Sequence, residues 1–247
     1  MRGIELVMRN WVTSFQKART AMRGLREDPD RTDLVNEIVE ALDMGRRRHF
    51  DPKIWGSAEA QRLLRERPCF DAAHVDLAEL ARLPEGSFGH TVACWMRSED
   101  FQPGLEGPEV TGEDDRAYVA RRIANVHDLW HVLSGHNRDP LGELGVLSFS
   151  LGQFRSNAFA FIVGNILWRS SIDHWRNRRG LVAPLLPYLY RAFRAGLRAK
   201  PLVPLVLEER FPRPLDEVRR ELQIDPLRAP FAPEGMPPIG APVTPAA

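Results

Sequence analysis

Apolar residues recur along most of the chain at spacings of three and four positions, which is the repeat of an α-helix with one buried face. The clearest stripe lies near the start of the chain and consists of Ile4, Met8, Trp11, Phe15, Ala18, Met22 and Leu25. The same repeat, together with turn and capping residues, predicts further helices over residues 34–42, 57–64, 71–83, 89–97, 114–134, 140–179, 187–198 and 215–222. No segment alternates apolar and polar residues as a half-buried strand does. The pattern therefore predicts an all-α fold.

Capping residues mark two consecutive helices in the middle of the chain. Thr111 and Asp114 have the spacing of a capping box, so we expect a helix to begin there and to continue as far as Gly135. Asp139 and Pro140 suit the N-cap and the first position of the next helix. We expect this second helix to run, with or without a kink, to about residue 179, and the chain to reverse direction between the two helices.

Proline is concentrated at the C-terminus, where seven prolines occupy the last 22 residues. Because proline breaks helices and lacks a backbone donor, we divide the chain into a helical domain of residues 1–225 and a Pro-rich tail of residues 226–247. With 43% apolar residues, the helical part is large enough for one substantial core.

Composition and charge exclude several classes of protein. The 34 basic and 33 acidic residues nearly balance, so nothing in the total charge indicates a nucleic-acid partner. Cys69 and Cys94 make neither a disulfide framework nor a zinc–thiolate site, and they fit a reducing compartment. No run reaches the roughly 20 apolar residues of a membrane span, and the charged N-terminus is unlike a signal peptide. These features predict a cytoplasmic, bacterial-type chain without a targeting segment.

The strongest chemical signal is a pair of histidines at His127 and His131, four residues apart and therefore on one face of a helix. Asp128 lies about 100° further around the axis. Glu143 falls in the first turn of the next helix and would face back toward the histidines once the chain reverses. Two imidazoles with one or two carboxylates suit zinc, iron(II), manganese or a similar divalent ion. The alternative is a set of ordinary polar residues at a helix edge.

These residues resemble the coenzyme Q (ubiquinone) biosynthesis protein four family. The resemblance is carried by Ala117-Tyr118-Val119, then His127-Asp128-x-x-His131 and, after eleven residues, Glu143. The stretch LARLPEGSFG at residues 80–89 is similar to the family's leucine-proline-glycine turn, and residues 196–201, 208–210 and 214–222 are similar to its closing segment.

The resemblance implies a single multi-helix domain with a metal site between two consecutive helices and an apolar cavity for a lipid. It implies a divalent ion, zinc or another such as iron(II), manganese or cobalt, held by His127, Asp128, His131 and Glu143, which would also be the catalytic residues. The implied enzyme is a 4-hydroxy-polyprenylbenzoate oxidative decarboxylase that removes the ring carboxylate and introduces a hydroxyl group at that carbon. The alternative is a non-catalytic lipid-binding scaffold that organises other ubiquinone-biosynthesis enzymes.

The expected partners are a polyprenylated aromatic substrate, the lipids of a membrane surface, the other enzymes of ubiquinone biosynthesis and a second copy of the chain in a homodimer. We expect peripheral association with the inner face of the cell membrane. Between residues 169 and 200, eight basic residues oppose one acid, which favours contact with anionic headgroups or acidic partners.

Several further residues have two interpretations. Tyr118, Arg121 and Arg122 precede the histidines and are candidates for binding the substrate, since a guanidinium matches a carboxylate; a solvated helix face is the alternative. His136 is either an acid or base on the substrate side or, more simply, an exposed histidine in a turn. The apolar segment 149–168 is expected to be core, with a prenyl-lined cavity or a dimer contact as the alternatives.

Overall fold

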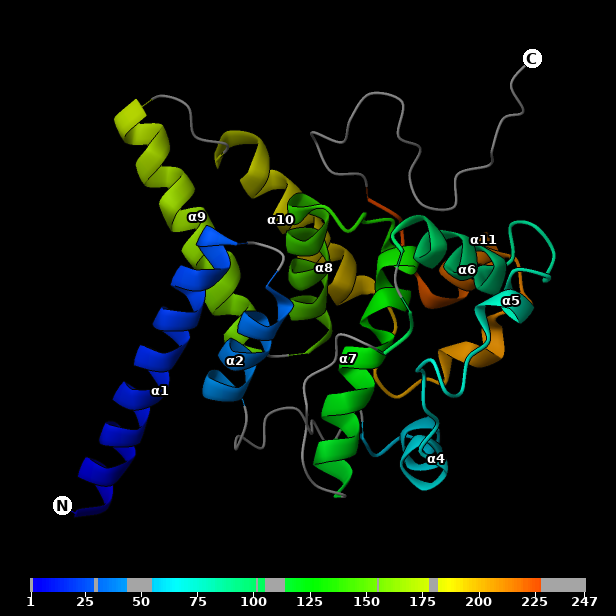
Figure 1. The fold of residues 1–247 in the computed structure, drawn as a ribbon, viewed down its shortest axis with the longest axis horizontal. Helices are drawn as coiled ribbons and strands as arrows, with labels where there is room; N and C mark the ends of the chain where they lie inside the picture. The colour runs from blue at the N-terminus through cyan, green and yellow to red at the C-terminus, as the bar shows by residue number, and fades with distance from the viewer. Residues whose placement is uncertain are drawn as a thin grey trace.

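All regular secondary structure in the described part of the chain is helical, which confirms the predicted fold class (Figure 1). The computed structural model describes residues 2–28, 31–43, 55–100, 102–104, 114–154, 156–177 and 182–227. The helices are α1 (Arg2–Glu27), α2 (Thr32–Leu42), α4 (Ala58–Glu66), α5 (Leu77–Leu80), α6 (Phe88–Ser98), α7 (Asp115–Ser134), α8 (Pro140–Gln153), α9 (Asn157–Asn177), α10 (Val182–Arg198) and α11 (Leu215–Leu222), with a 3₁₀ helix, η2, at Leu207–Arg210.

The predicted end of α7 at Gly135 and the predicted start of α8 at Asp139 and Pro140 are confirmed. The side chain of Asp114 accepts a hydrogen bond from the N–H of Ala117 at the start of α7, and Gly135 ends this helix in the left-handed conformation at φ 79°. Asp139 accepts the N–H groups of Leu141 and Gly142 at the start of α8. Thr111, the other half of the expected capping box, lies outside the described residues.

The prediction of one helix over residues 71–83 is wrong, because the chain forms a turn at Asp71. Its Oδ1 accepts hydrogen bonds from the N–H of Ala73 at 3.0 Å and from the N–H of His74 at 3.1 Å, and these bonds stabilise the turn. Only Leu77–Leu80 is helical there, and Asp76 provides the N-cap by accepting from Ala78 N–H at 2.7 Å. A short polar side chain can replace helical hydrogen bonds in this way.

The single helix expected over residues 140–179 is instead two helices, α8 and α9. The chain is extended at Phe154, and the buried carboxylate of Asp43, at the end of α2, accepts the hydroxyl of Ser156 at 2.6 Å and the N–H of Asn157 at 2.8 Å. Asp43 thereby satisfies the first donors of α9 from a distant part of the chain. The helix expected from Pro187 begins five residues earlier, at Val182, and includes this proline. The 3₁₀ helix η2 was not predicted.

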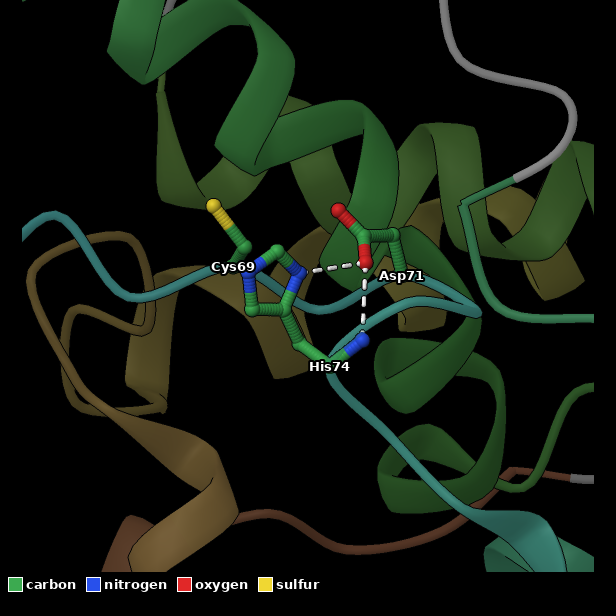
Figure 2. Close-up of side chains that lie close together, drawn as sticks. All are labelled: Cys69, Asp71 and His74. Carbon is green, nitrogen blue, oxygen red and sulfur yellow. Dashed lines mark hydrogen bonds and ion pairs between the residues drawn. The ribbon is translucent and has the colours of Figure 1, made fainter.

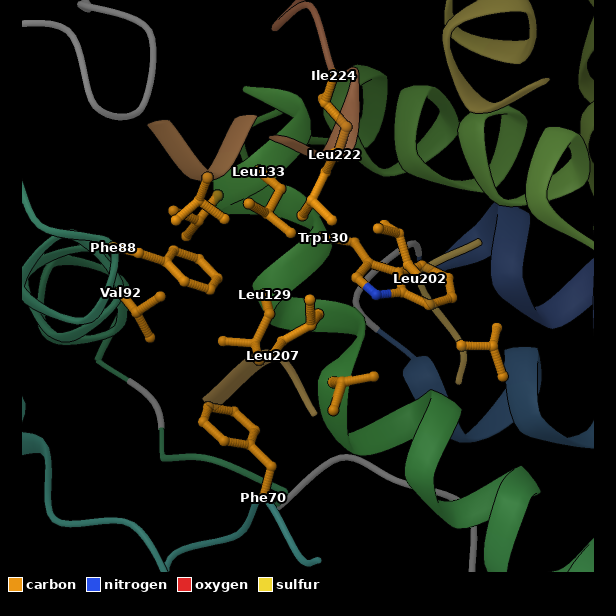
Figure 3. Packing of buried hydrophobic residues seen from close by; sticks show 14 of the residues in the cluster. Phe70, Phe88, Val92, Leu129, Trp130, Leu133, Leu202, Leu207, Leu222 and Ile224 are labelled. Carbon is orange, nitrogen blue, oxygen red and sulfur yellow. The ribbon is translucent and has the colours of Figure 1, made fainter. Parts of the chain in front are cut away.

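Buried side chains form two hydrophobic clusters that meet at α8. The first packs α4, α6, α7 and α11 with residues 195–224, and Leu129, Trp130 and Leu133 of α7 lie at its centre (Figure 3). The second joins α1, α2 and α9 with one side of α8 and the first half of α10. α8 contributes to both clusters, so the junction between α7 and α8 is held from two sides.

The C-terminal end of α7 is fixed by residues from the closing segment of the chain. The buried guanidinium of Arg219 donates to the carbonyl oxygens of Val132 at 2.8 Å and Leu133 at 3.0 Å, and the N–H of Leu227 donates to Ser134 at 2.8 Å. These bonds satisfy carbonyl groups that a helix end leaves without partners. These hydrogen bonds hold the last residues of α7 in place, and with them the start of the turn that follows.

Candidate metal centre

His127 and His131 of α7 and Glu143 of α8 converge at the junction of these two helices. The Nε2 atoms of the two histidines lie 3.1 Å apart. The carboxylate of Glu143 approaches Nε2 of His127 at 3.5 Å and Nε2 of His131 at 3.4 Å. One ligand atom from each residue thus lies within 4.8 Å of the others. The structure confirms that Glu143 faces back toward the histidines.

Two glycines beside Glu143 allow α8 to approach the preceding turn this closely. A Cβ atom on Gly142 would lie 1.9 Å from the carbonyl oxygen of Asn137. A Cβ atom on Gly145 would lie 2.2 Å from the Tyr188 hydroxyl and 2.7 Å from the ring of His136. No side chain larger than hydrogen fits at either position without movement of its neighbours.

His131 is the most constrained member of the cluster, with a side chain only 1% exposed. Its Nδ1 lies 3.0 Å from the backbone carbonyl oxygen of His136, and its ring stacks on Trp95 of α6 at a centroid distance of 5.3 Å. A carbonyl oxygen only accepts, so Nδ1 carries the hydrogen and Nε2 faces the cluster. Trp95 was not identified from the sequence, because nothing in the spacing of α6 and α7 indicates this contact.

The charges of His131 and Glu143 shift each other's pKa. Burial alone would lower the pKa of His131, but the charge and hydrogen bond of Glu143 outweigh it and raise this pKa above its usual value. Burial likewise would raise the pKa of Glu143, yet the charge of His131 and the hydrogen bonds from both histidines hold it well below its usual range. Glu143 is therefore an ionised carboxylate at neutral pH.

His136 is buried, which corrects the expectation of an exposed turn histidine. Its Nδ1 lies 2.9 Å from the hydroxyl of Tyr188 on α10, and this hydroxyl donates to the carbonyl oxygen of Leu141 at 3.2 Å. Burial, with a further contribution from His131, lowers the pKa of His136 to about 3, so its ring is neutral. Because Tyr188 lies 52 positions further along the chain, no local signal predicts this contact.

The structure does not bring the other predicted site residues into the cluster. Asp128 is not in the group of atoms within 4.8 Å, although its charge acts on His131. The buried guanidinium of Arg122 pairs with Glu208 through bonds of 2.5 and 2.6 Å, and the hydroxyl of Tyr118 donates to Pro68 at 3.1 Å. Arg122 precedes His127 by five residues and is therefore rotated about 140° around α7. Burial raises the pKa of Tyr118 to about 12.

The three clustered residues fit a divalent metal ion. Two imidazole nitrogens and one carboxylate form a common three-ligand set, which leaves further positions for water or substrate. The hydrogen bond from His131 to a carbonyl oxygen is the kind of contact that orients a metal-binding imidazole. The side chains of His127 and Glu143 are 25% and 38% exposed, so the cluster is accessible from solvent on one side.

The fold and the cluster define an all-helical protein with two histidines and a glutamate gathered between consecutive helices. The sequence model of the coenzyme Q (ubiquinone) biosynthesis protein Coq4 family matches residues 7–228, and the chain belongs to this family. Its role is therefore in ubiquinone biosynthesis.

Individual relatives agree with this assignment. The mitochondrial ubiquinone biosynthesis protein COQ4 homolog 1 of Culex quinquefasciatus is 31% identical over 207 residues, which are 81% of this chain and 70% of that protein. Mitochondrial COQ4 of Pyricularia oryzae is 28% identical over 204 residues, 81% of this chain and 64% of that protein. A crystal structure of a putative ubiquinone biosynthesis protein from Nostoc punctiforme has the same fold, with a TM-score of 0.65 at 22% identity over 84% of this chain and 96% of that one.

The apolar segment 149–168 packs against the core, as expected, but much of it is only partly buried and it ends in an exposed aromatic residue. Phe149, Ile162 and Val163 are buried, whereas the side chain of Trp168 is 68% exposed. In the described part of the chain, no helix combines the length and the hydrophobicity that crossing a bilayer requires. The predicted lipid cavity stays a prediction.

Proposed function

We propose that His127, His131 and Glu143 hold a divalent metal ion, zinc or another such as iron(II), manganese or cobalt. The observation that carries this proposal is the convergence of two imidazoles and an ionised carboxylate from consecutive helices on one point. Asp128, the residue after His127, is the fourth ligand in this proposal. Its carboxylate is not among the ligand atoms that lie within 4.8 Å of one another, so it would join the ion through a rotation of its side chain.

The proposed reaction is the oxidative decarboxylation of a 4-hydroxy-polyprenylbenzoate. The ring carboxylate leaves as carbon dioxide, and one oxygen atom of dioxygen, the oxidant, becomes the hydroxyl group at the same carbon. One molecule of dioxygen therefore serves two substrate molecules, and no separate reductant is consumed. A divalent ion held by His127, His131 and Glu143 would supply Lewis acidity for the negative charge that develops as carbon dioxide departs. Membership of a ubiquinone-biosynthesis family supports this substrate class.

The residues around the cluster would orient the substrate and limit the access of water. Trp95 covers one face of His131 and makes that side of the cluster apolar. The side chains of His127 and Glu143 are partly exposed, so the ring carboxylate could approach them from solvent. Arg121 lies two turns before Asp128 and within about 20° of it around α7, so it is the arginine we assign to the substrate carboxylate.

We propose that the protein works at the surface of a membrane, as a cytoplasmic chain at the inner face of the cell membrane. Large apolar side chains are exposed at Trp11, Phe15, Trp168, Leu186, Tyr190 and Leu197. The basic residues Arg169, Arg191, Arg194, Arg198 and Lys200 are exposed on α9 and α10 and just beyond them. Apolar and basic side chains together suit a surface of anionic lipids, where a prenylated substrate resides. A homodimer and contacts with other enzymes of the pathway belong to the same proposal.

The exposed apolar residues also favour a second function, a lipid-binding scaffold in which the cluster is purely structural. A product assay separates the two functions. Metal-loaded protein is incubated with the carboxylated prenyl substrate in vesicles under isotope-labelled dioxygen, and the extracted lipid is analysed by mass spectrometry. The enzyme yields carbon dioxide and a hydroxylated product that contains the label. Substrate that binds but is recovered unchanged would support the scaffold instead.

A further inference from the structure

Cys69, Asp71 and His74 form a second cluster of potential ligands, in the segment between α4 and α5 (Figure 2). Nδ1 of His74 lies 2.6 Å from Oδ1 of Asp71, and one atom each of the thiol, the carboxylate and the imidazole lie within 4.8 Å of one another. Among the described residues, this group and the cluster of α7 and α8 are the two sets of three that such a distance criterion finds. They share no residue.

Core contacts hold the backbone of this segment in place. Phe70 is fully buried and packs on Phe211 at a centroid distance of 6.1 Å, while its neighbours Cys69 and Asp71 are more exposed. The carbonyl oxygen of Pro68 accepts the hydroxyl of Tyr118 at 3.1 Å. Because Phe70 and Pro68 are anchored to other elements, the two side chains that flank Phe70 are presented from a fixed backbone.

The turn at Asp71 brings His74 back onto the same side of the chain. The N–H of His74 donates to Oδ1 of Asp71 at 3.1 Å, and the N–H of Val75 donates to the carbonyl oxygen of Asp71 at 2.9 Å. Val75 packs against the core. The segment is therefore anchored at Pro68 and Phe70 on one side and at Val75 on the other. The thiol, the carboxylate and the imidazole all lie between Pro68 and Val75.

We propose that Cys69, Asp71 and His74 form a second metal site, which takes a divalent transition ion of the zinc class with water at the fourth position. A thiolate and an imidazole select zinc or cobalt(II) over magnesium or calcium, and a carboxylate is a common third ligand. Ligand atoms around a tetrahedral zinc ion are about 3.5 Å apart, so the cluster needs only small side-chain rotations to close.

The sequence alone did not indicate this site, since two isolated cysteines lack the repeated spacing of a zinc–thiolate motif. The exposure of the cluster also fits the proposal, because the side chain of His74 is 58% exposed and an ion can enter from solvent. The simpler description is a surface hydrogen bond between aspartate and histidine beside a free thiol.

Cobalt(II) titration of the reduced protein distinguishes these descriptions. A thiolate bound to cobalt(II) gives a charge-transfer band in the near ultraviolet, and the cluster of α7 and α8 contains no sulfur. The band therefore reports on a cysteine site alone, whether or not the proposed function is correct. The chain has one other cysteine, Cys94, and its Sγ lies 3.7 Å from a ring nitrogen of His90, so Cys94→Ser is the matched control.

The wild-type protein and Cys94→Ser should both show the band, and Cys69→Ser should lose it. His74→Asn should weaken cobalt binding at this site by at least about tenfold, since it removes one of three protein ligands. Zinc should compete the band away and protect Cys69 from alkylation. Absence of a thiolate band at a small excess of cobalt, or a band that persists in Cys69→Ser, would overturn the proposal. Far-ultraviolet circular dichroism checks that each variant is folded.

Discussion

The side chain of His131 and the main chain of His136 are joined by a hydrogen bond of 3.0 Å between Nδ1 and the carbonyl oxygen. This bond fixes the ring nitrogen that faces Glu143, and it depends on the turn through Gly135 that ends α7. Arg219 and Leu227 hold the same turn from the C-terminal side. The candidate metal centre is therefore determined by the turn after α7 as much as by the spacing of the histidines.

Replacement of Glu143 by glutamine should greatly weaken metal binding and turnover. The amide is nearly isosteric but uncharged, so it is a poor substitute for a carboxylate ligand. Helical content should change little, but the metal-free protein should melt at a lower temperature, because the amide lacks the charge that pairs with the buried His131. Metal titration, the product assay and circular dichroism measure these effects. Glu217→Gln is the control, because Glu217 is also an acid in a first helical turn. Undiminished turnover of Glu143→Gln at limiting metal would contradict the ligand role.

Gly145→Ala should disturb the metal centre although position 145 contributes no ligand. The added methyl group would lie 2.2 Å from the hydroxyl of Tyr188 and 2.7 Å from the ring of His136, and relief of this overlap moves the residue whose carbonyl orients His131. We expect lower metal affinity and a loss of roughly 1–3 kcal/mol in stability from overpacking.

The control for this substitution is Gly164→Ala in α9. A Cβ atom at position 164 meets nothing within 4 Å, so alanine should stabilise the helix by up to about 1 kcal/mol. Equal metal affinity in Gly145→Ala and the wild-type protein would show that the close approach of α8 does not matter to the site.

Glu221 should make the stability of the protein depend on pH in the acid range. Its carboxylate accepts from Arg210 at 2.8 Å and also pairs with Arg213, and hydrogen bonds from these arginines lower the pKa of Glu221 below its usual 4.5. The unfolded state therefore binds a proton at a higher pH than the folded state. The stabilisation, of the order of 1 kcal/mol, is present above about pH 4.5 and is lost as the pH falls through the lower folded-state pKa. Glu221→Gln should melt below the wild-type protein at pH 7, and this difference should shrink near pH 3. A difference independent of pH would refute the assignment.

Truncation after Leu227 should leave folding and metal binding intact. The seven prolines of residues 226–247 remove backbone donors, and few large apolar residues remain to anchor that segment. Truncation after Asp225 should cost more, because it removes the bond from Leu227 to Ser134 and the contact of Pro226 with Gly135. Melting temperatures should differ by a few degrees per kcal/mol lost. A large loss of stability in the product that ends at Leu227 would show that residues beyond 227 contribute to the core.

Binding to anionic vesicles should depend on the exposed face of α9 and α10. Flotation should carry the wild-type protein upward at low salt and less so at high salt, since headgroup attraction is screened. Trp168→Ala and the double variant Arg191→Ser, Arg194→Ser should float less. The double variant Arg65→Ser, Arg82→Ser removes the same charge from other exposed positions and should behave like the wild-type protein. No flotation at low salt would exclude this mode of membrane association.

Local sequence determined most of the helices and the spacing of the two histidines in the candidate metal centre. The caps at Ser57, Asp114 and Asp139 and the left-handed Gly135 act through neighbouring residues, so they are readable from the sequence. The same is true of the spacing of His127 and His131, since helix geometry alone places them on one face. His127 and His131 converge for this reason, whereas Glu143 joins them because the chain reverses between α7 and α8.

Tertiary contacts decided what neighbouring residues cannot specify. The break between α8 and α9 depends on Asp43, which caps Asn157 from 114 positions away. The burial of His136 depends on Tyr188, and the ring of His131 is covered by Trp95 from another helix. Such contacts depend on which surfaces meet when helices pack, and that is settled by the burial of the whole core rather than by any periodic pattern within one segment.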